Sequence, residues 1–155
     1  MSMTFLAQRD QQERLEWLDG GVLSLLLDGA ATDGQLMVGR FAVRRGEAPP
    51  YHVHTREDEV FLLIEGTALL WSDGRRSELS AGGVAFLPRG VPHGYRITSP
   101  TADLLMICTP SGIEGMFREV GRDVSAPRPP GWRVDLDRLA EAAAERGNTI
   151  LGPPR

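Results

Sequence analysis

The sequence contains no lysine, and this absence excludes several kinds of chemistry. All 17 of its basic residues are arginines. A Schiff-base enzyme, a phosphate-binding loop with its lysine and a lysine general base are therefore not expected. Cys108 is the only cysteine, which excludes an internal disulfide and a metal cage built from cysteines.

Excess positive charge and long apolar runs are also missing. The formal net charge of the 155 residues is −4, so a basic surface for nucleic acid is not expected. No apolar run approaches the roughly 20 residues that span a bilayer. The N-terminus lacks the basic and apolar regions of a signal peptide. We therefore expect a cytoplasmic protein with no nucleic-acid or membrane partner.

Short apolar runs punctuated by glycine, proline and aspartate dominate the first two thirds of the chain. They lie at Val22–Leu27, Gln35–Val43, Val60–Ile64, Thr67–Trp71, Val84–Leu87, Gly94–Thr98 and Asp103–Cys108. No helical pattern separates them, so the spacing predicts an all-β protein, an antiparallel sandwich or barrel. Ser72-Asp73-Gly74 predicts the clearest hairpin turn.

The pattern changes after the last of these runs. We expect residues 1–112 to form the barrel with its N-terminal strands, and the core of that barrel to lie at 35–108. Residues 113–155 are expected to add a helical segment, a proline-rich linker and a tail that packs on the barrel. The spacing predicts helices over Ile113–Val120 and Asp135–Arg146.

The three histidines and one glutamate are candidate ligands of a metal ion. His52 and His54 are two residues apart on a predicted strand, so their side chains point to the same face. Glu59 follows a polar segment that can redirect the chain, and His93 lies where a later strand can return beside the first. Three imidazoles and one carboxylate suit one divalent transition metal (Fe, Mn, Ni, Co, Cu or Zn) better than Mg or Ca.

Two further acidic residues lie close to this set. Glu57 and Asp58 immediately precede Glu59. Strand alternation would turn Asp58 away from Glu59, and we expect both Glu57 and Asp58 to be solvated loop charges.

These residues resemble the two motifs of the cupin family. The first motif is GEAPPYHVHTREDEVFLLIEG at 46–66, and the second is GGVAFLPRGVPHGYRI at 82–97. The terminal Asn of the family motif is Ile97 here. That Asn is not a metal ligand in the family, so the difference affects only a structural or outer-shell role at this position. The stretch LLMICTPSGIEGMFREVG and the C-terminal residues are similar to single-domain cupins described as quercetin 2,3-dioxygenase-like.

This resemblance implies a cupin double-stranded β-helix, a jelly-roll barrel with a short helical C-terminal appendage. It implies that His52, His54, Glu59 and His93 bind the metal. It also implies that Glu59 is catalytic, as the acceptor of a substrate proton. A dioxygenase acting with dioxygen on a flavonol-like aromatic or an enolisable small molecule is then expected, in a homodimer. A non-redox isomerase, decarboxylase or lyase, or a non-catalytic binding protein, remains an alternative.

Side chains that share the face of the ligands are expected to line an apolar cavity. Strand phase places Phe61, Leu63 and Tyr95 on that face. The predicted substrate-binding residues are Phe41, Phe61, Leu63, Phe86, Tyr95 and Met106. Met116 and Phe117 are expected to cap the mouth of the barrel.

Overall fold

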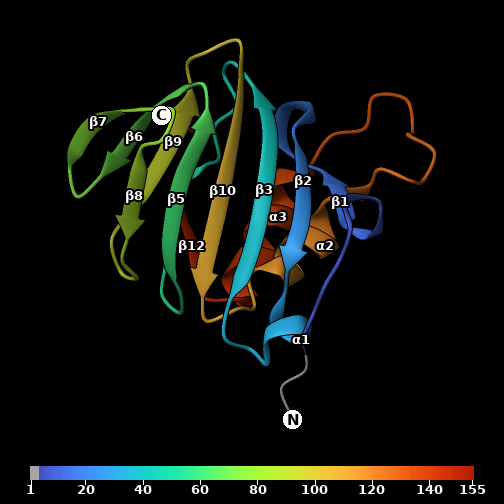
Figure 1. The fold of residues 1–155 in the computed structure, drawn as a ribbon. Coiled ribbons are helices and arrows are strands. Elements are labelled where there is room, and N and C mark those ends of the chain that lie inside the picture. Colours follow the sequence, from blue (N-terminus) through green and yellow to red (C-terminus); the bar gives the residue numbers. More distant parts are fainter. Residues whose placement is uncertain (1–3) are drawn as a thin grey trace.

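The computed structural model describes residues 4–155, which form two antiparallel sheets that lie against each other (Figure 1). The larger sheet has seven strands, in the spatial order β11 (Arg122–Asp123), β1 (Glu13–Glu16), β2 (Val22–Leu27), β3 (Met37–Arg44), β10 (Thr101–Thr109), β5 (Asp58–Glu65) and β8 (Val84–Leu87). The smaller sheet has five strands, in the order β12 (Asn148–Gly152), β4 (Tyr51–His54), β9 (His93–Ile97), β6 (Thr67–Ser72) and β7 (Arg75–Ser80). The predicted all-β class, with two antiparallel sheets and a helical C-terminal segment, is confirmed.

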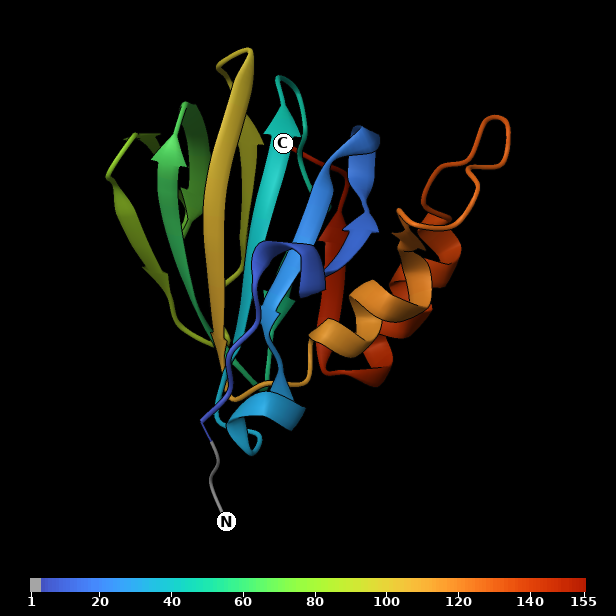
Figure 2. The same ribbon diagram turned by 45° about the vertical axis from the view of Figure 1, so that its right-hand side comes forward.

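Short helices complete the chain. They are the 3₁₀ turns Arg9–Gln11 and Leu18–Gly20 and the helices α1 (Gly29–Thr32), α2 (Glu114–Val120) and α3 (Leu136–Glu145). Figure 2 shows α2 and α3 together at one side of the barrel, next to the strands β1 and β12. Both C-terminal helices lie where the sequence predicts them.

The ends of α3 follow local rules. The Asp135 side chain accepts hydrogen bonds from the backbone N–H groups of Asp137 and Arg138, at 3.0 and 3.2 Å, and so caps the first turn. Gly147 ends the helix with φ +78°, and a Cβ there would meet Thr55 Oγ1 at 2.6 Å. Glycine is therefore required at this reversal of the chain.

The predicted hairpin is also present. Strands β6 and β7 pair with Ser72 opposite Arg75, which leaves a two-residue loop at Asp73 and Gly74. Both loop residues have positive φ, 50° and 70°, as a type I′ turn requires.

The C-terminal tail contains a strand that the sequence pattern does not predict. Residues Asn148–Gly152 form β12, which pairs with β4 and is the edge strand of the smaller sheet. The run is short and begins with two polar residues, so strand periodicity does not identify it. Glu13–Glu16 also forms a strand, β1, which pairs with β2 and with β11.

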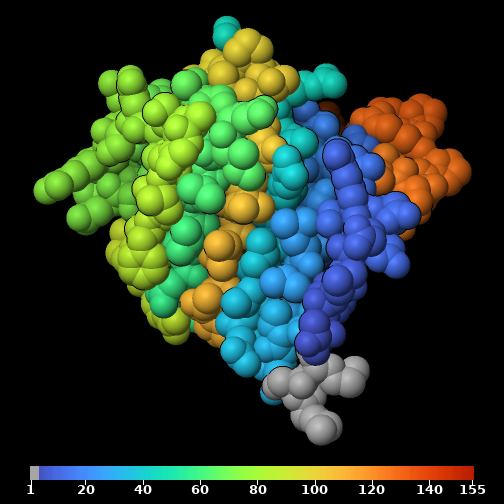
Figure 3. Space-filling view, viewed as in Figure 1, coloured from blue at the N-terminus to red at the C-terminus, as the bar shows by residue number. Residues whose placement is uncertain are grey.

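The chain passes from the smaller sheet to the larger one between β4 and β5, through residues 55–57. The inner faces of both sheets, together with α2 and α3, bury one apolar core. Figure 3 shows the outer face of the larger sheet, with its strands side by side. Within residues 4–155, no helix has both the length and the apolar character needed to cross a membrane.

Candidate metal centre

Four side chains from three strands meet between the sheets. His52 and His54 project from β4, and His93 is the register partner of His52 on β9. Glu59 reaches them from β5, in the opposite sheet. One ligand atom from each of the four residues lies within 4.8 Å of the others. The structure thus brings together the whole set that the sequence predicts as metal ligands.

Backbone carbonyls orient two of the imidazoles. His52 Nδ1 lies 2.6 Å from Pro50 O, and His93 Nδ1 lies 3.1 Å from Val91 O. A carbonyl oxygen can only accept, so each Nδ1 carries the hydrogen and donates it. Each Nε2 then presents its lone pair to the centre, which is the tautomer that a metal-ligating histidine needs.

Glu57 orients the third imidazole, and the prediction that it is a solvated loop charge is wrong. Its Oε1 accepts a hydrogen bond from His54 Nδ1 at 2.6 Å, and its side chain is buried. The short segment between β4 and β5 turns Glu57 inward beneath the histidine. Asp58, as expected, points away from the centre. It forms an ion pair with Arg89, at 2.8 Å, near the surface.

The charges of the cluster are strongly coupled. Burial, together with the neighbouring imidazoles, lowers the pKa of His52 to about 4. Burial also acts to lower the pKa of His54, but Glu57 and Glu59 outweigh it and raise this pKa to about 9. Burial of Glu59 acts to raise its pKa, yet His54 and His93 hold that pKa well below its usual range. Glu59 is therefore an ionised carboxylate at neutral pH.

The spacing of the donor atoms fits a transition metal ion. His52 Nε2 lies 3.0 Å from His54 Nε2, and Glu59 Oε2 lies 3.2 and 3.3 Å from the Nε2 atoms of His54 and His93. Two ligands bound at right angles with bonds of about 2.1 Å are about 3.0 Å apart. Within residues 4–155, Glu59 Oε2 and His93 Nε2 are buried and have no hydrogen-bond partner of good geometry. All four residues could hold one ion.

An apolar cavity of about 80 Å³ adjoins the four donors. Three of the predicted substrate-binding residues, Phe41, Tyr95 and Met106, line it. Met116 and Phe117 from α2 line it as well, as expected of residues that cap the barrel. The hydroxyl of Tyr95 donates to the buried Glu47, 3.1 Å away.

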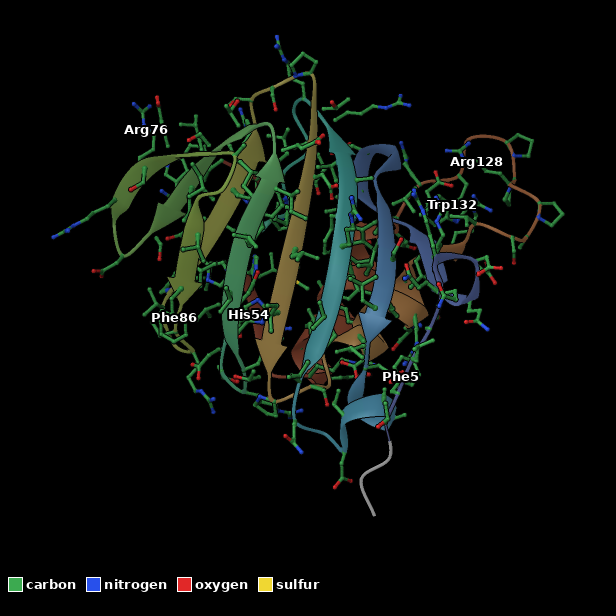
Figure 4. All side chains as sticks on the ribbon, in the orientation of Figure 1. Phe5, His54, Arg76, Phe86, Arg128 and Trp132 are labelled. Atoms are coloured by element: carbon green, nitrogen blue, oxygen red, sulfur yellow. The ribbon has the colours of Figure 1, made fainter. Side chains whose placement is uncertain are left out.

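The other three predicted substrate-binding residues do not line this cavity. Phe61 is buried beside it, with its ring centroid 4.7 Å from that of Tyr95, and Leu63 lies in the core. Phe86 is 64% exposed. It pairs in register with Val60, so it takes the outward phase of β5 rather than that of Glu59. Figure 4 shows Phe86 at the outer edge of the barrel, whereas His54 lies behind β5 and β10.

Several cavity residues were not predicted from the sequence. They come from the N-terminal segment, from the loop before β4 and from the C-terminal segment, and are Trp17, Leu18, Pro49, Pro50, Leu139, Ala143, Asn148 and Ile150. Their positions depend on contacts between distant parts of the chain. Glu57, in contrast, carries a weak local signal, because an acidic residue three positions after a metal-binding histidine can reach its free ring nitrogen.

A family model described as a cupin domain matches residues 39–110. The chain contains a cupin domain. This cupin is 30% identical over 146 residues to quercetin 2,3-dioxygenase of Bacillus subtilis, an alignment that covers 92% of the chain and 43% of that enzyme. It is 28% identical over 79 residues to quercetin 2,3-dioxygenase of Aspergillus japonicus, covering 48% and 23%. The chain thus spans less than half the length of either enzyme.

Solved structures show the same fold. KdgF from Halomonas sp. superimposes with a TM-score of 0.65 and 17% identity, over 72% of this cupin and 98% of that chain. A predicted oxalate decarboxylase from Thermotoga maritima gives 0.58 and 20%, over 68% and 99%. At these identities the similarity concerns the barrel alone.

Proposed function

We propose that this cupin binds one divalent transition metal through His52, His54, Glu59 and His93. The observation that carries the proposal is the convergence of four donor atoms, three of which belong to imidazoles that are already oriented by hydrogen bonds at Nδ1. The similarity to two quercetin 2,3-dioxygenases supports a dioxygenase that acts on a metal-chelating small molecule.

Charge balance supports a divalent ion. Glu57 and Glu59 are both buried, and a protonated His54 between them would balance only one of the two negative charges, so the other would still carry a desolvation penalty. An ion of charge +2 neutralises both, while the histidines remain neutral donors. Glu57 therefore belongs to the centre, because its carboxylate orients His54 and supplies the second negative charge that balances a divalent ion.

The cavity favours a small, enolisable substrate over a flavonol. Its volume is about 80 Å³, whereas an engineered cavity of about 150 Å³ is known to hold benzene. A three-ring flavonol needs much more space, so it would require α2 or α3 to move. A β-dicarbonyl compound that chelates through two oxygens is closer to the available size.

Each part of the site has a task in this reaction. The apolar side chains of α2 and α3 exclude water, and the imidazoles remain fixed by their Nδ1 hydrogen bonds. Glu59 is an ionised, buried carboxylate, and we assign it as the acceptor of the enol proton of the substrate. The metal, when bound, would polarise the chelating oxygens and promote reaction with dioxygen.

The first test is metal analysis of protein purified without a metal-affinity tag, next to the double variant His52→Ala, His93→Ala. About one transition metal ion per chain, lost in the double variant, is expected. Oxygen uptake is then measured with acetylacetone and with quercetin, and acetylacetone should be the better substrate. Absence of metal from the wild type after reconstitution would refute the metal site.

Two comparisons separate the reaction classes. Glu59→Gln should reduce turnover more than metal content, because the amide remains a possible ligand but cannot accept the proton. Zn²⁺ should abolish oxygen uptake in a dioxygenase. Activity retained with Zn²⁺ would indicate a non-redox enzyme, and ligand binding without turnover would indicate a binding protein.

Association of two chains and a cytoplasmic location are part of the same proposal. Symmetric dimers are the commonest oligomers, and the N-terminal strand region is the surface that we expect to pair. Sedimentation velocity of the metal-loaded protein measures this directly, and a single monomeric species would refute the dimer.

A further inference from the structure

Asn148 is a buried polar side chain in a mainly apolar part of the cavity. It lines the same space as the four donor residues, and only 3% of its surface is exposed. Within residues 4–155, neither its Nδ2 nor its Oδ1 has a hydrogen-bond partner. Most buried amides in proteins are paired, so an amide with both ends free needs an explanation.

The position of this amide is fixed by the backbone around it. Asn148 is the register partner of His54, and side chains directly opposite each other on antiparallel strands share a face. The residue before it, Gly147, accepts hydrogen bonds from the backbone N–H and the hydroxyl of Thr55, at 2.9 and 2.6 Å. The amide is therefore held on the strand next to His54, directly opposite this proposed metal ligand.

The chemistry of the free amide defines what it can bind. An asparagine offers two N–H donors and one carbonyl acceptor, and carries no charge. It therefore suits a neutral group that can both accept and donate, such as a hydroxyl. The hydroxyl of Tyr95, another polar group of the cavity, already donates its one hydrogen to Glu47.

We propose that Asn148 is a specificity-determining residue that binds a hydroxyl group of the substrate, next to the oxygens that chelate the metal. This inference rests on the proposed function, because it assumes a substrate that chelates the metal in this cavity. It narrows the substrate class to small chelators with one further neutral hydroxyl. A site that pairs with a hydroxyl discriminates strongly against analogues that lack it.

Two hydroxamic acids test the inference directly. Glycolohydroxamic and propionohydroxamic acid chelate metals through the same group and have equal numbers of non-hydrogen atoms, but the first has a hydroxyl where the second has a methyl. Calorimetric titration of the Co²⁺-loaded wild type should give a preference of about tenfold for the glycolo compound, the effect of one good hydrogen bond. Asn148→Leu and Asn148→Ala should both lose this preference.

A second readout needs neither metal nor ligand. Leucine has nearly the shape of asparagine but no polar atoms, so Asn148→Leu should raise the melting temperature of the metal-free protein by about 2–4 °C. The matched control is Thr149→Val, on the exposed face of the same strand, which should change neither the preference nor the melting temperature.

The outcomes separate this inference from the proposed function. If the wild type binds both hydroxamates but both Asn148 variants keep the wild-type preference, the inference is refuted and the metal site stands. A lower melting temperature for Asn148→Leu, with Thr149→Val unchanged, would show a structural asparagine and also refute it. If neither hydroxamate binds the Co²⁺-loaded wild type, the proposed function fails and the inference fails with it.

Discussion

Glu57 provides the sharpest test of how the proposed metal centre is built. Its carboxylate lies 2.6 Å from His54 Nδ1, and the two side chains are only 5% and 6% exposed. A hydrogen bond to a charged group contributes about 1.5–3 kcal/mol, which corresponds to about 10- to 100-fold in metal affinity. Glu57→Gln keeps an acceptor and should lose about tenfold. Glu57→Leu keeps none and should approach 100-fold.

The pH dependence distinguishes this effect from general damage. The pKa of His54 is raised to about 9 without metal, so below that pH a metal ion must displace a proton. The affinity of the wild type should then fall about tenfold per pH unit below pH 9. Loss of the Glu57 charge lowers the pKa of His54 and weakens this competition. The difference between wild type and variant should therefore be largest near pH 9 and shrink towards pH 6.

Competition titration of Co²⁺ against nitrilotriacetate across this pH range measures both quantities. Asp58→Asn is the matched control, because Asp58 is the adjacent carboxylate but pairs with Arg89 at the surface. Far-ultraviolet circular dichroism checks that each variant is folded. Equal affinities of the wild type and Glu57→Leu at pH 9 would refute the reasoning, as would an equal loss in Asp58→Asn.

Three further predictions concern stability and access to the cavity. Burial raises the pKa of Glu47 from 4.5 to about 8, so its contribution to stability is complete below pH 4.5 and is lost as the pH rises to 8. This loss amounts to at most about 5 kcal/mol in the metal-free protein, and Glu47→Gln should remove this pH dependence. Denaturant titration measures the free energy of unfolding at pH 5 and pH 8, and an equal decrease between these pH values in both proteins would contradict the prediction. Phe117→Ala removes a buried ring from the cavity wall and should cost about 3–5 kcal/mol, while improving the binding of larger chelators in the same calorimetric assay; unchanged size selectivity would count against the capping role. Chelation of metal held at about 100 times its Kd should lower the melting temperature by about 5–10 °C, with no change in the double variant His52→Ala, His93→Ala, and a shift of equal size in that variant would contradict the site.

Local rules were sufficient for much of the fold. The hairpin at Asp73 and Gly74 follows from the two positive φ angles that this turn needs, and α3 begins where Asp135 can cap it. Strand alternation places His52 and His54 on one face. These features depend on residues close together in the chain, so the sequence carries their signal directly.

Other features depend on pairing between distant segments. Phe86 points outward because β8 pairs with β5 in a register that sets it opposite Val60, and no local pattern states that register. Glu57 lies in the short segment that connects β4 to β5, and it becomes buried because those two strands enter opposite sheets.

The sequence by itself determined the candidate metal-binding set, because His52, His54, Glu59 and His93 combine a spacing and a donor chemistry that suit one divalent ion. Only the tertiary structure decided what surrounds that set. Asn148 reaches the cavity because β12 pairs with β4, from which it is separated by more than half the chain. The helices α2 and α3, which also line the cavity, lie in the same C-terminal segment. The cost and register of such long-range pairing depend on the whole packed core, and a local sequence pattern does not contain them.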